Sequence, residues 1–260
     1  MRPPGILSEA ARAVAEQVLA EEEARRRHLV VVLSGAHAYG FPSPDSDLDL
    51  KGLHVEPTRR LVGLEPPPLH ANRLEVIQGV EIDYSSNEIG PALASLLGGN
   101  GTYLERVLGS IGLKAAAELG ELQALIRRNL SRALYRHYHG FAEAQRRTFE
   151  SAAEPTAKRL LYVLRTALTG THLLRTGALV TDLTEIMDEY GFGAARALVE
   201  AKRTGERVVL GEATREAWRG ELGRALALLD EARERSPLPE EAPARAEAEA
   251  WLIELRRRCF

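Results

Sequence analysis

The sequence has little cysteine, few aromatic side chains and almost no net charge. Of 260 residues, one is cysteine (Cys259) and 5% are aromatic, while 34 Lys and Arg against 37 Asp and Glu leave a formal charge of −3. A single cysteine excludes an intramolecular disulfide framework and a zinc site built on several cysteines. The near-neutral balance argues against a dedicated nucleic-acid scaffold, which needs a basic excess, but leaves room for a local basic groove.

Long apolar runs are also missing. The sequence has no stretch of about 20 apolar residues that could span a membrane, and residues 1–5 lead into alternating apolar and charged positions instead of a signal-peptide core. We therefore expect no membrane partner and a reducing, cytoplasmic location. With 45% hydrophobic and 27% charged residues, the composition is that of an ordinary soluble globular protein.

Hydrophobic spacing predicts the first elements of the fold. Residues 6–27 carry apolar side chains at helical spacing, with Ser8 as a plausible helix cap. Residues 29–33 form a continuous β-branched run, typical of a buried strand, and residues 47–55 alternate between apolar and polar at period two. The chain thus begins with one helix and two strands.

The remaining pattern moves from strands to helices. Residues 74–77 and 80–84 alternate on either side of Gly79, which indicates a hairpin or a bulge. From residue 88 onward the spacing is nearly all helical. Strands first and helices afterwards predict an α+β architecture, in which a mixed sheet with flanking helices precedes a helical C-terminal domain. We expect domain boundaries at 1–110, 111–235 and 236–260, the last segment being a linker and a terminal helix.

Acidic residues gather where the second strand begins. Asp47 and Asp49 are two positions apart, so their side chains point to the same side of a strand. A further carboxylate comes from the strand at 80–84, where Asp83 and Glu81 share one face and the position relative to the following helix favours Asp83. Three carboxylates on neighbouring strands can clamp two Mg²⁺ ions for phosphoryl transfer.

A glycine turn supplies the complement to these acids. Gly35 directly follows the buried strand and opens a short helix, so backbone amides there can approach a phosphate group. A triphosphate on the turn and a metal on the carboxylates would place the α-phosphate between them.

The residues of this turn and strand resemble a known superfamily. The segments LSGAHAYG at 33–40 and SDLDLKG at 46–52 look like the nucleotidyltransferase superfamily that includes DNA polymerase beta. Within it, the Tyr-Gly pair and the Ser-Asp-x-Asp-x-x-Gly strand are similar to a bacterial and phage branch of nucleotidyltransferases, part of which is associated with RNA repair. The resemblance covers about the first two thirds of the chain and is specific in residues 33–55.

The resemblance implies a set of site residues. Metal binding and catalysis fall to Asp47, Asp49 and Asp83, of which Asp83 helps to activate the acceptor hydroxyl. Nucleotide contacts fall to the turn, the start of the second strand and a later helix, namely to Gly35, Ala36, His37, Tyr39, Ser46, Lys158, Tyr162 and Arg165. The last three share one face of a predicted helix, for which nucleotide binding and a merely solvated face stay open as alternatives.

The resemblance also implies an activity. We expect Mg²⁺-dependent or Mn²⁺-dependent transfer of a nucleoside monophosphate from an NTP, with ATP favoured, to a hydroxyl of RNA, protein or a small molecule, with release of pyrophosphate. Ala36 stands where the superfamily usually has serine, so one hydroxyl contact to the triphosphate is missing. The alternative is therefore a nucleotide-binding regulatory or antitoxin-like module with weak catalysis. A homodimer is compatible with either hypothesis.

Overall fold

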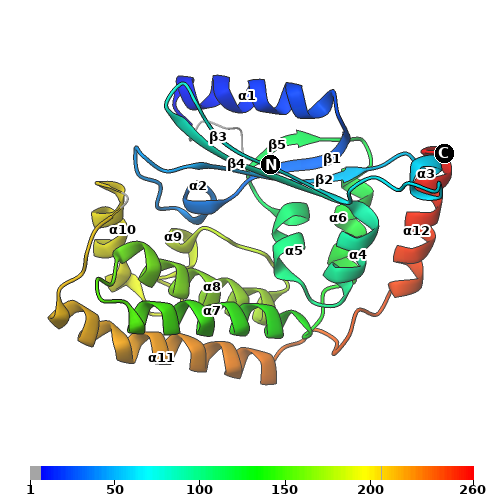
Figure 1. Cartoon of the computed structure of the whole chain (residues 1–260). Coiled ribbons are helices and arrows are strands. Elements are labelled where there is room, and N and C mark those ends of the chain that lie inside the picture. Colours follow the sequence, from blue (N-terminus) through cyan, green and yellow to red (C-terminus); the bar gives the residue numbers. More distant parts are fainter. Residues whose placement is uncertain (1–6, 206) are drawn as a thin grey trace. The chain divides into compact units, whose positions relative to one another are not determined.

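Separate stretches of the chain build each of two structural units (Figure 1). The computed structural model describes residues 7–205 and 207–260. The sheet unit consists of the residues up to Gly35, 47–129 and 242–260. The helical unit consists of residues 36–46 and 130–241.

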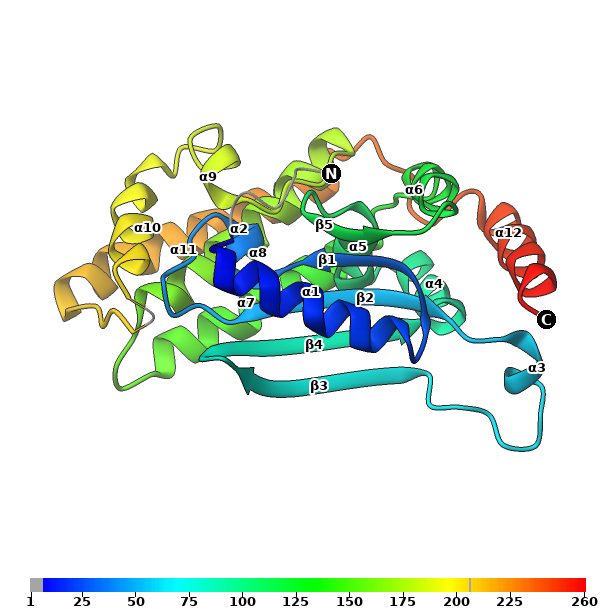
Figure 2. The ribbon, with the colours of Figure 1, turned by 90° about the horizontal axis from the view of Figure 1, so that it is seen from above.

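The sheet unit is built on five strands in the order β3-β4-β2-β1-β5, which Figure 2 shows from above. Strands β2 and β4 are parallel, and the other neighbouring pairs are antiparallel. The mixed sheet followed by helices confirms the predicted α+β class. The strand bounds are β1 (Arg27–Leu33), β2 (Leu48–Val55), β3 (His70–Ile77), β4 (Val80–Glu88) and β5 (Gly112–Ala115).

A hairpin joins β3 to β4. Ile77 pairs with Val80, and the two residues between them, Gln78 and Gly79, have φ values of 50° and 81°. Two positive φ angles are what a tight two-residue hairpin turn requires. The hairpin alternative for Gly79 is therefore confirmed.

The short strand β5 corrects the expectation of a nearly all-helical pattern after residue 88. It pairs with β1 at the edge of the sheet, with an irregular register between Val31 and Val32. Four residues are too few for a period-two pattern to stand out from the helical segments around them. The pairing partner, which lies about 80 residues earlier in the chain, decides the structure here.

Helices cover both faces of the sheet. Helix α1 (Glu9–Glu23) lies on one face, while α4 (Ile89–Leu97), α5 (Gly101–Leu108) and α6 (Leu119–Arg128) lie on the other (Figure 1). Ser8 caps α1 as predicted, since its Oγ accepts a hydrogen bond from the Ala11 amide at 3.2 Å. The predicted end of this helix at Arg27 is wrong, because Arg27 already opens β1. The expected start at Ile6 lies outside the described residues.

The C-terminal helix packs within the sheet unit. Helix α12 (Arg245–Arg258) accepts a 2.6 Å hydrogen bond from the Thr58 hydroxyl at the carbonyl of Arg256. Thr58 begins the short helix α3 (Thr58–Leu61). The Arg256 guanidinium also forms a 2.6 Å ion pair with Glu88, which is 1% exposed. Polar contacts thus fix this helix.

The helical unit is centred on one buried helix. Helix α8 (Ala157–Thr176) packs against α7 (Leu134–Ser151) and α11 (Glu212–Glu234), and 14 of its residues are buried. The shorter helices are α2 (Gly35–Tyr39), which begins in the sheet unit, α9 (Leu183–Ile186), η1 (Gly193–Ala195) and α10 (Arg196–Arg203). No helix in the described part of the chain is long and apolar enough to cross a membrane.

Candidate active site

Two of the predicted carboxylates face each other across neighbouring strands. In the parallel pair of β2 and β4, Asp49 stands directly opposite Asp83. Residues paired in this way project to the same face of the sheet. Asp47 precedes β2 by one residue, and Glu81 is exposed and lies beyond this pairing. The structure therefore brings Asp83, and not Glu81, next to Asp49.

A lysine lies between the two carboxylates. The Lys51 ammonium is 3.3 Å from Oδ1 of Asp49 and 2.7 Å from Oδ1 of Asp83. It also donates a 3.0 Å hydrogen bond to the backbone carbonyl of Asp83. Lys51 follows Asp49 by two residues and so shares its face of β2. This spacing is visible in the sequence, but the contact of Lys51 with both carboxylates is not. It is the most direct site residue that sequence reasoning missed.

The glycine turn lies against one of these acids. Gly35 has a φ of 60°, and a Cβ atom built on it would overlap with the carboxylate of Asp49. The Ser34 amide donates a 2.8 Å hydrogen bond to the Asp49 carbonyl, which joins the turn to β2. Only glycine provides both the left-handed backbone and the space that the carboxylate occupies. The predicted turn glycine and metal ligand are thus neighbours.

The surroundings of Asp49 shift the pKa of its carboxyl group. Burial and the neighbouring charges of Asp47 and Asp83 together raise the pKa of Asp49 to about 6, against the lowering effect of Lys51. A carboxylate that resists ionisation in this way gains most from an added positive charge. Such perturbed acids are typical of functional sites.

The donor chemistry suits a divalent cation. Carboxylate oxygens are the ligands that Mg²⁺ and Mn²⁺ prefer, and Asp49 and Asp83 already share one positive charge from Lys51. Within residues 7–205 and 207–260, no group of three or more His, Cys, Asp or Glu side chains is arranged to hold a metal ion. The residues fit a cation by chemistry and charge, but they do not form a ready-made metal cluster.

The predicted nucleotide contacts on α8 gather around the α2 segment of the helical unit. The rings of Tyr39 and Tyr162 meet edge to face at 5.6 Å, and the Arg165 guanidinium lies 3.7 Å from the Tyr39 centroid. The Lys158 ammonium is 6.0 Å from the Tyr162 ring. Arg165 is only 7% exposed. Four of the predicted contacts thus form one aromatic and cationic cluster, in which Arg165 lies against Tyr39.

The other predicted contacts of this segment are partly committed to local structure. Ala36 is buried and His37 is half-buried. The Ser46 hydroxyl accepts a 2.9 Å hydrogen bond from the Ser43 amide, and the Ser43 hydroxyl in turn accepts a 2.6 Å hydrogen bond from Lys202. Ser46 therefore closes a turn that is fixed to α10.

Comparison with known families decides the classification. Residues 11–254 match the RNA repair pathway DNA polymerase beta family, RlaP. The chain belongs to the RlaP family. This membership confirms the resemblance to the polymerase beta superfamily that residues 33–55 indicated, and extends it over nearly the whole chain.

Two further proteins are similar to this RlaP family member. An uncharacterized protein of Methanocaldococcus jannaschii is 28% identical over 178 residues, which are 67% of this chain and 72% of that protein. A crystal structure of a nucleotidyltransferase-like protein from Exiguobacterium sibiricum matches with a TM-score of 0.35 and 12% identity, covering 86% of this chain and 74% of that one.

A second cation of the RlaP chain, Arg106, interacts electrostatically with Asp83 and was also missed from sequence. Arg106 of α5 is 8% exposed and donates hydrogen bonds to the Gly52 carbonyl at 2.9 Å, to Asn87 at 2.7 Å and to Ser85 at 3.2 Å. Ser85 and Asn87 share a face of β4 with Asp83. Arg106 thus anchors the strand that carries Asp83, a role that no sequence spacing revealed because α5 and β4 are brought together only by folding.

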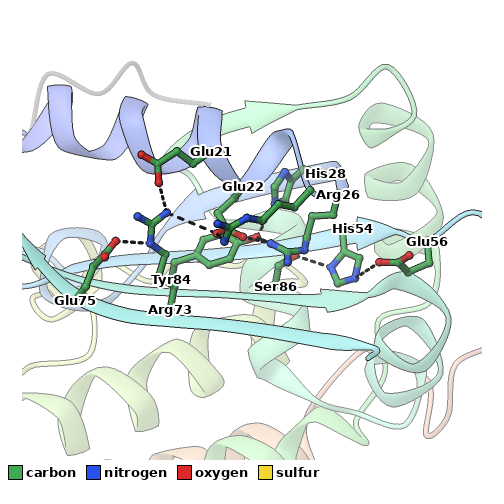
Figure 3. A network of polar contacts seen from close by, with 11 residues as sticks. Glu21, Glu22, Arg26, His28, His54, Glu56, Arg73, Glu75, Tyr84 and Ser86 are labelled. Atoms are coloured by element: carbon green, nitrogen blue, oxygen red, sulfur yellow. Dashed lines mark hydrogen bonds and ion pairs between the residues drawn. The ribbon is translucent and has the colours of Figure 1, made fainter. Parts of the chain in front are cut away.

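The opposite face of the sheet carries a separate polar network (Figure 3). The Tyr84 hydroxyl bonds to Nε2 of His28 at 2.7 Å and accepts a 3.2 Å hydrogen bond from Arg26. Nδ1 of His54 lies 2.8 Å from the Ser86 hydroxyl. Burial lowers the pKa of both histidines to about 4. Since His54 and Ser86 are at most 1% exposed, this serine–histidine pair is closed to substrates and stabilises the fold of this RlaP family member.

Proposed function

We propose that this protein is a metal-dependent nucleotidyltransferase that moves a nucleoside monophosphate from an NTP to a hydroxyl of RNA and releases pyrophosphate. One observation carries the proposal: Asp49 and Asp83 stand opposite each other on parallel strands, share a cation, and lie against a glycine turn. Membership of an RNA repair family supports RNA as the acceptor class.

The side chains have distinct roles in this proposal. Asp47, Asp49 and Asp83 would hold Mg²⁺ or Mn²⁺, which would neutralise charge on the phosphates and polarise the attacked phosphorus. The amides that follow Gly35 would hold the triphosphate. We further propose His37, Tyr39, Ser46, Lys158, Tyr162 and Arg165 as nucleotide contacts, with Arg165 acting through the Tyr39 ring that it supports.

The chemical step balances within these groups. The acceptor oxygen forms a new bond to the α-phosphorus of the NTP, while the bond between this phosphorus and the β-phosphate oxygen breaks. The pair of electrons leaves with pyrophosphate. The proton of the acceptor hydroxyl passes to a carboxylate oxygen of Asp83, which acts as general base.

The test uses NTPs labelled at the α-phosphate. Each of the four NTPs is incubated with the protein, Mg²⁺ or Mn²⁺, and either RNA with free hydroxyl ends or a panel of proteins. We expect label on RNA, and Asp47→Asn or Asp49→Asn should lower transfer at least about 100-fold, the scale seen when one charge-stabilising group is removed. Asp188→Asn is the matched control, because Asp188 is an exposed acid paired with Arg196. Unchanged transfer in the Asp49→Asn variant would contradict the proposed active site.

Two features favour a second candidate, a nucleotide-binding module without turnover. Ala36 provides no hydroxyl to the triphosphate, and the Lys51 ammonium already lies between Asp49 and Asp83. Calorimetry with a non-hydrolysable NTP separates the two hypotheses. Binding of the analogue, combined with no transfer to any acceptor, would favour the module over the enzyme.

A further inference from the structure

The helical unit contains a large cavity beside the N-terminal half of α8. Its volume is about 1210 Å³, and α7, α8, the segment between them and Arg207 line it. Pockets for small ligands span about 300–1,000 Å³. The cavity therefore suits a ligand larger than one small molecule.

Aromatic rings form one part of the wall. Phe141 of α7 is 52% exposed, an unusual position for a phenylalanine, and Tyr162 of α8 is half-buried. His137 lies 4.6 Å from Phe141 at an interplanar angle of 31°, and Phe41 lies 5.8 Å from Tyr162. Neighbouring rings thus hold each aromatic in place, and each can offer a surface to a flat, unsaturated group.

Positive charge forms another part of the wall. Lys158, Arg159 and Arg207 line the cavity against a single acid, Glu154, which pairs with Arg207. The lining therefore carries a formal charge of +2, although the whole chain is slightly negative. The N-terminus of the 20-residue helix α8 adds the positive end of its dipole at Thr156. A ligand with repeated negative charges complements this wall.

Aromatic surfaces combined with cations indicate the chemistry of the ligand. Proteins bind single-stranded nucleic acid by stacking bases on aromatic side chains while a positive groove follows the phosphates. An acidic peptide would use the cations but would leave Phe141 without a partner. We propose that this cavity binds a short single-stranded segment of the RNA acceptor, with a base on Phe141 and phosphates on Arg159 and Arg207, while Lys158 and Tyr162 remain the NTP contacts proposed above; the choice of RNA rests on that proposed function.

The test measures RNA binding without the transfer reaction. Fluorescence anisotropy follows a labelled single-stranded RNA of about ten nucleotides in EDTA and without NTP. We expect Phe141→Ala to weaken binding by about 5- to 150-fold, the effect of losing one stacked base, and Phe141→Trp to retain it. Arg159→Gln should reduce the slope of log affinity against log salt by about 0.7, the value for one phosphate contact on a single strand.

Matched controls separate the cavity from the rest of the surface and from catalysis. Arg235→Gln removes a cation of the same unit whose side chain is 78% exposed and outside the cavity, so RNA affinity and salt slope should stay unchanged. Asp49→Asn should bind RNA like the original protein even where it transfers nothing. If the original protein transfers nothing to RNA but still binds it in a Phe141-dependent way, the enzyme hypothesis alone is contradicted.

Three outcomes would overturn the inference. One is RNA affinity that is the same in the Phe141→Ala and Arg159→Gln variants as in the original protein, with unchanged thermal unfolding. Another is displacement of the RNA by excess ATP, which would assign the cavity to the NTP. The third is equal affinity for single-stranded DNA of the same sequence, which would remove the assignment to RNA.

Discussion

The two faces of the sheet carry polar clusters that differ in charge balance and accessibility. On the face covered by α1, Glu22 lies among Arg25, Arg26 and Arg73, and histidine, tyrosine and serine partners complete a buried network (Figure 3). On the other face, Asp49 and Asp83 share one lysine, and the Asp83 side chain remains 39% exposed.

The difference shows where the fold leaves room for a ligand. On the α1 face, three arginines, Arg25, Arg26 and Arg73, match the carboxylates of Glu21, Glu22 and Glu75, so these acids need no cation from solution. The carboxylates around Asp49 outnumber the lysine that they share, and burial together with the charges of Asp47 and Asp83 raises the pKa of Asp49 to about 6. An accessible cluster whose charges do not balance is typical of a functional site, whereas a buried network whose charges balance is typical of a structural one. Four predictions break or sharpen this contrast.

Lowering the pH should destabilise the protein through the polar network on the α1 face. Burial, with a smaller contribution from nearby positive charge including Arg26, lowers the pKa of His28 and of His54 from 6.5 to about 4. Because the unfolded chain binds protons more readily in this range, stability is present above pH 6.5 and is lost as pH falls toward 4. We expect a loss on the order of 3–6 kcal/mol in the free energy of unfolding from these two groups. Denaturant unfolding measured from pH 7 to pH 4 checks it.

Variants identify the groups responsible for this pH dependence. His54 faces Ser86 and Glu56, and His28 faces Tyr84. His28→Asn and His54→Asn should each flatten the profile, whereas His70→Gln on the exposed start of β3 should leave it unchanged. An identical slope in all variants would assign the acid sensitivity to other groups.

Removing the central acid of the network should have the next largest effect. Glu22→Gln keeps the shape of the side chain but leaves Arg26 and Arg73 beside a neutral amide. Breaking a buried ion pair from one side costs about 3–5 kcal/mol. Glu21→Gln on the same helix is the control, because the Glu21 side chain is 40% exposed and solvent screens its charge, so the substitution should cost far less. Equal costs for the two variants in denaturant unfolding would contradict the contrast between buried and exposed acids.

The contrast itself could be predicted only in part from sequence. Period-two alternation places Asp47 and Asp49 on one side of a strand, and the position of Asp83 relative to the following helix favours it over Glu81, so the acidic half of the site is visible in the sequence. The network is not, because it depends on a register shift in β1 between His28 and Val30. This shift brings His28 opposite His54, whereas simple alternation from Leu33 would point it to the other face.

Long-range pairing explains the remaining gaps. Arg106 and Asn87 are 19 positions apart and meet only because α5 packs on the sheet. Lys51 was visible in the strand, but its position between Asp49 and Asp83 depends on the parallel pairing of β2 with β4, whose register no local pattern reveals. The sheet unit also includes residues 242–260, whose return to it leaves no trace in hydrophobic spacing.

The glycine turn offers a matched pair of substitutions. Gly35→Ala places a methyl group into the Asp49 carboxylate at a positive φ, whereas Gly79→Ala has a similar φ of 81° with no atom within 4 Å of the new methyl group. The backbone alone costs about 1–2 kcal/mol, and overpacking adds about 1–3 kcal/mol. We expect Gly35→Ala to lose about 3 kcal/mol of unfolding free energy and Gly79→Ala about 1 kcal/mol. Equal losses would show that the contact with Asp49 does not constrain the turn.

The smallest effect should come from the cation that Asp49 and Asp83 share. Lys51→Met keeps the length of the side chain and removes its charge, so in EDTA we expect a loss of about 1 kcal/mol, typical of a partly exposed ion pair. Mg²⁺ should then raise the unfolding temperature more in this variant than in the original protein, because the ion no longer competes with an ammonium group for the same oxygens. Lys114→Met is the control, because Lys114 lies on β5 and pairs with Glu23 of α1, away from Asp49. This substitution should leave the Mg²⁺ response unchanged. If Mg²⁺ raises the unfolding temperature of the original protein and of Lys51→Met equally, Lys51 does not occupy the position of the metal. Asp49 and Asp83 would then need no added cation, like the acids of the α1 face.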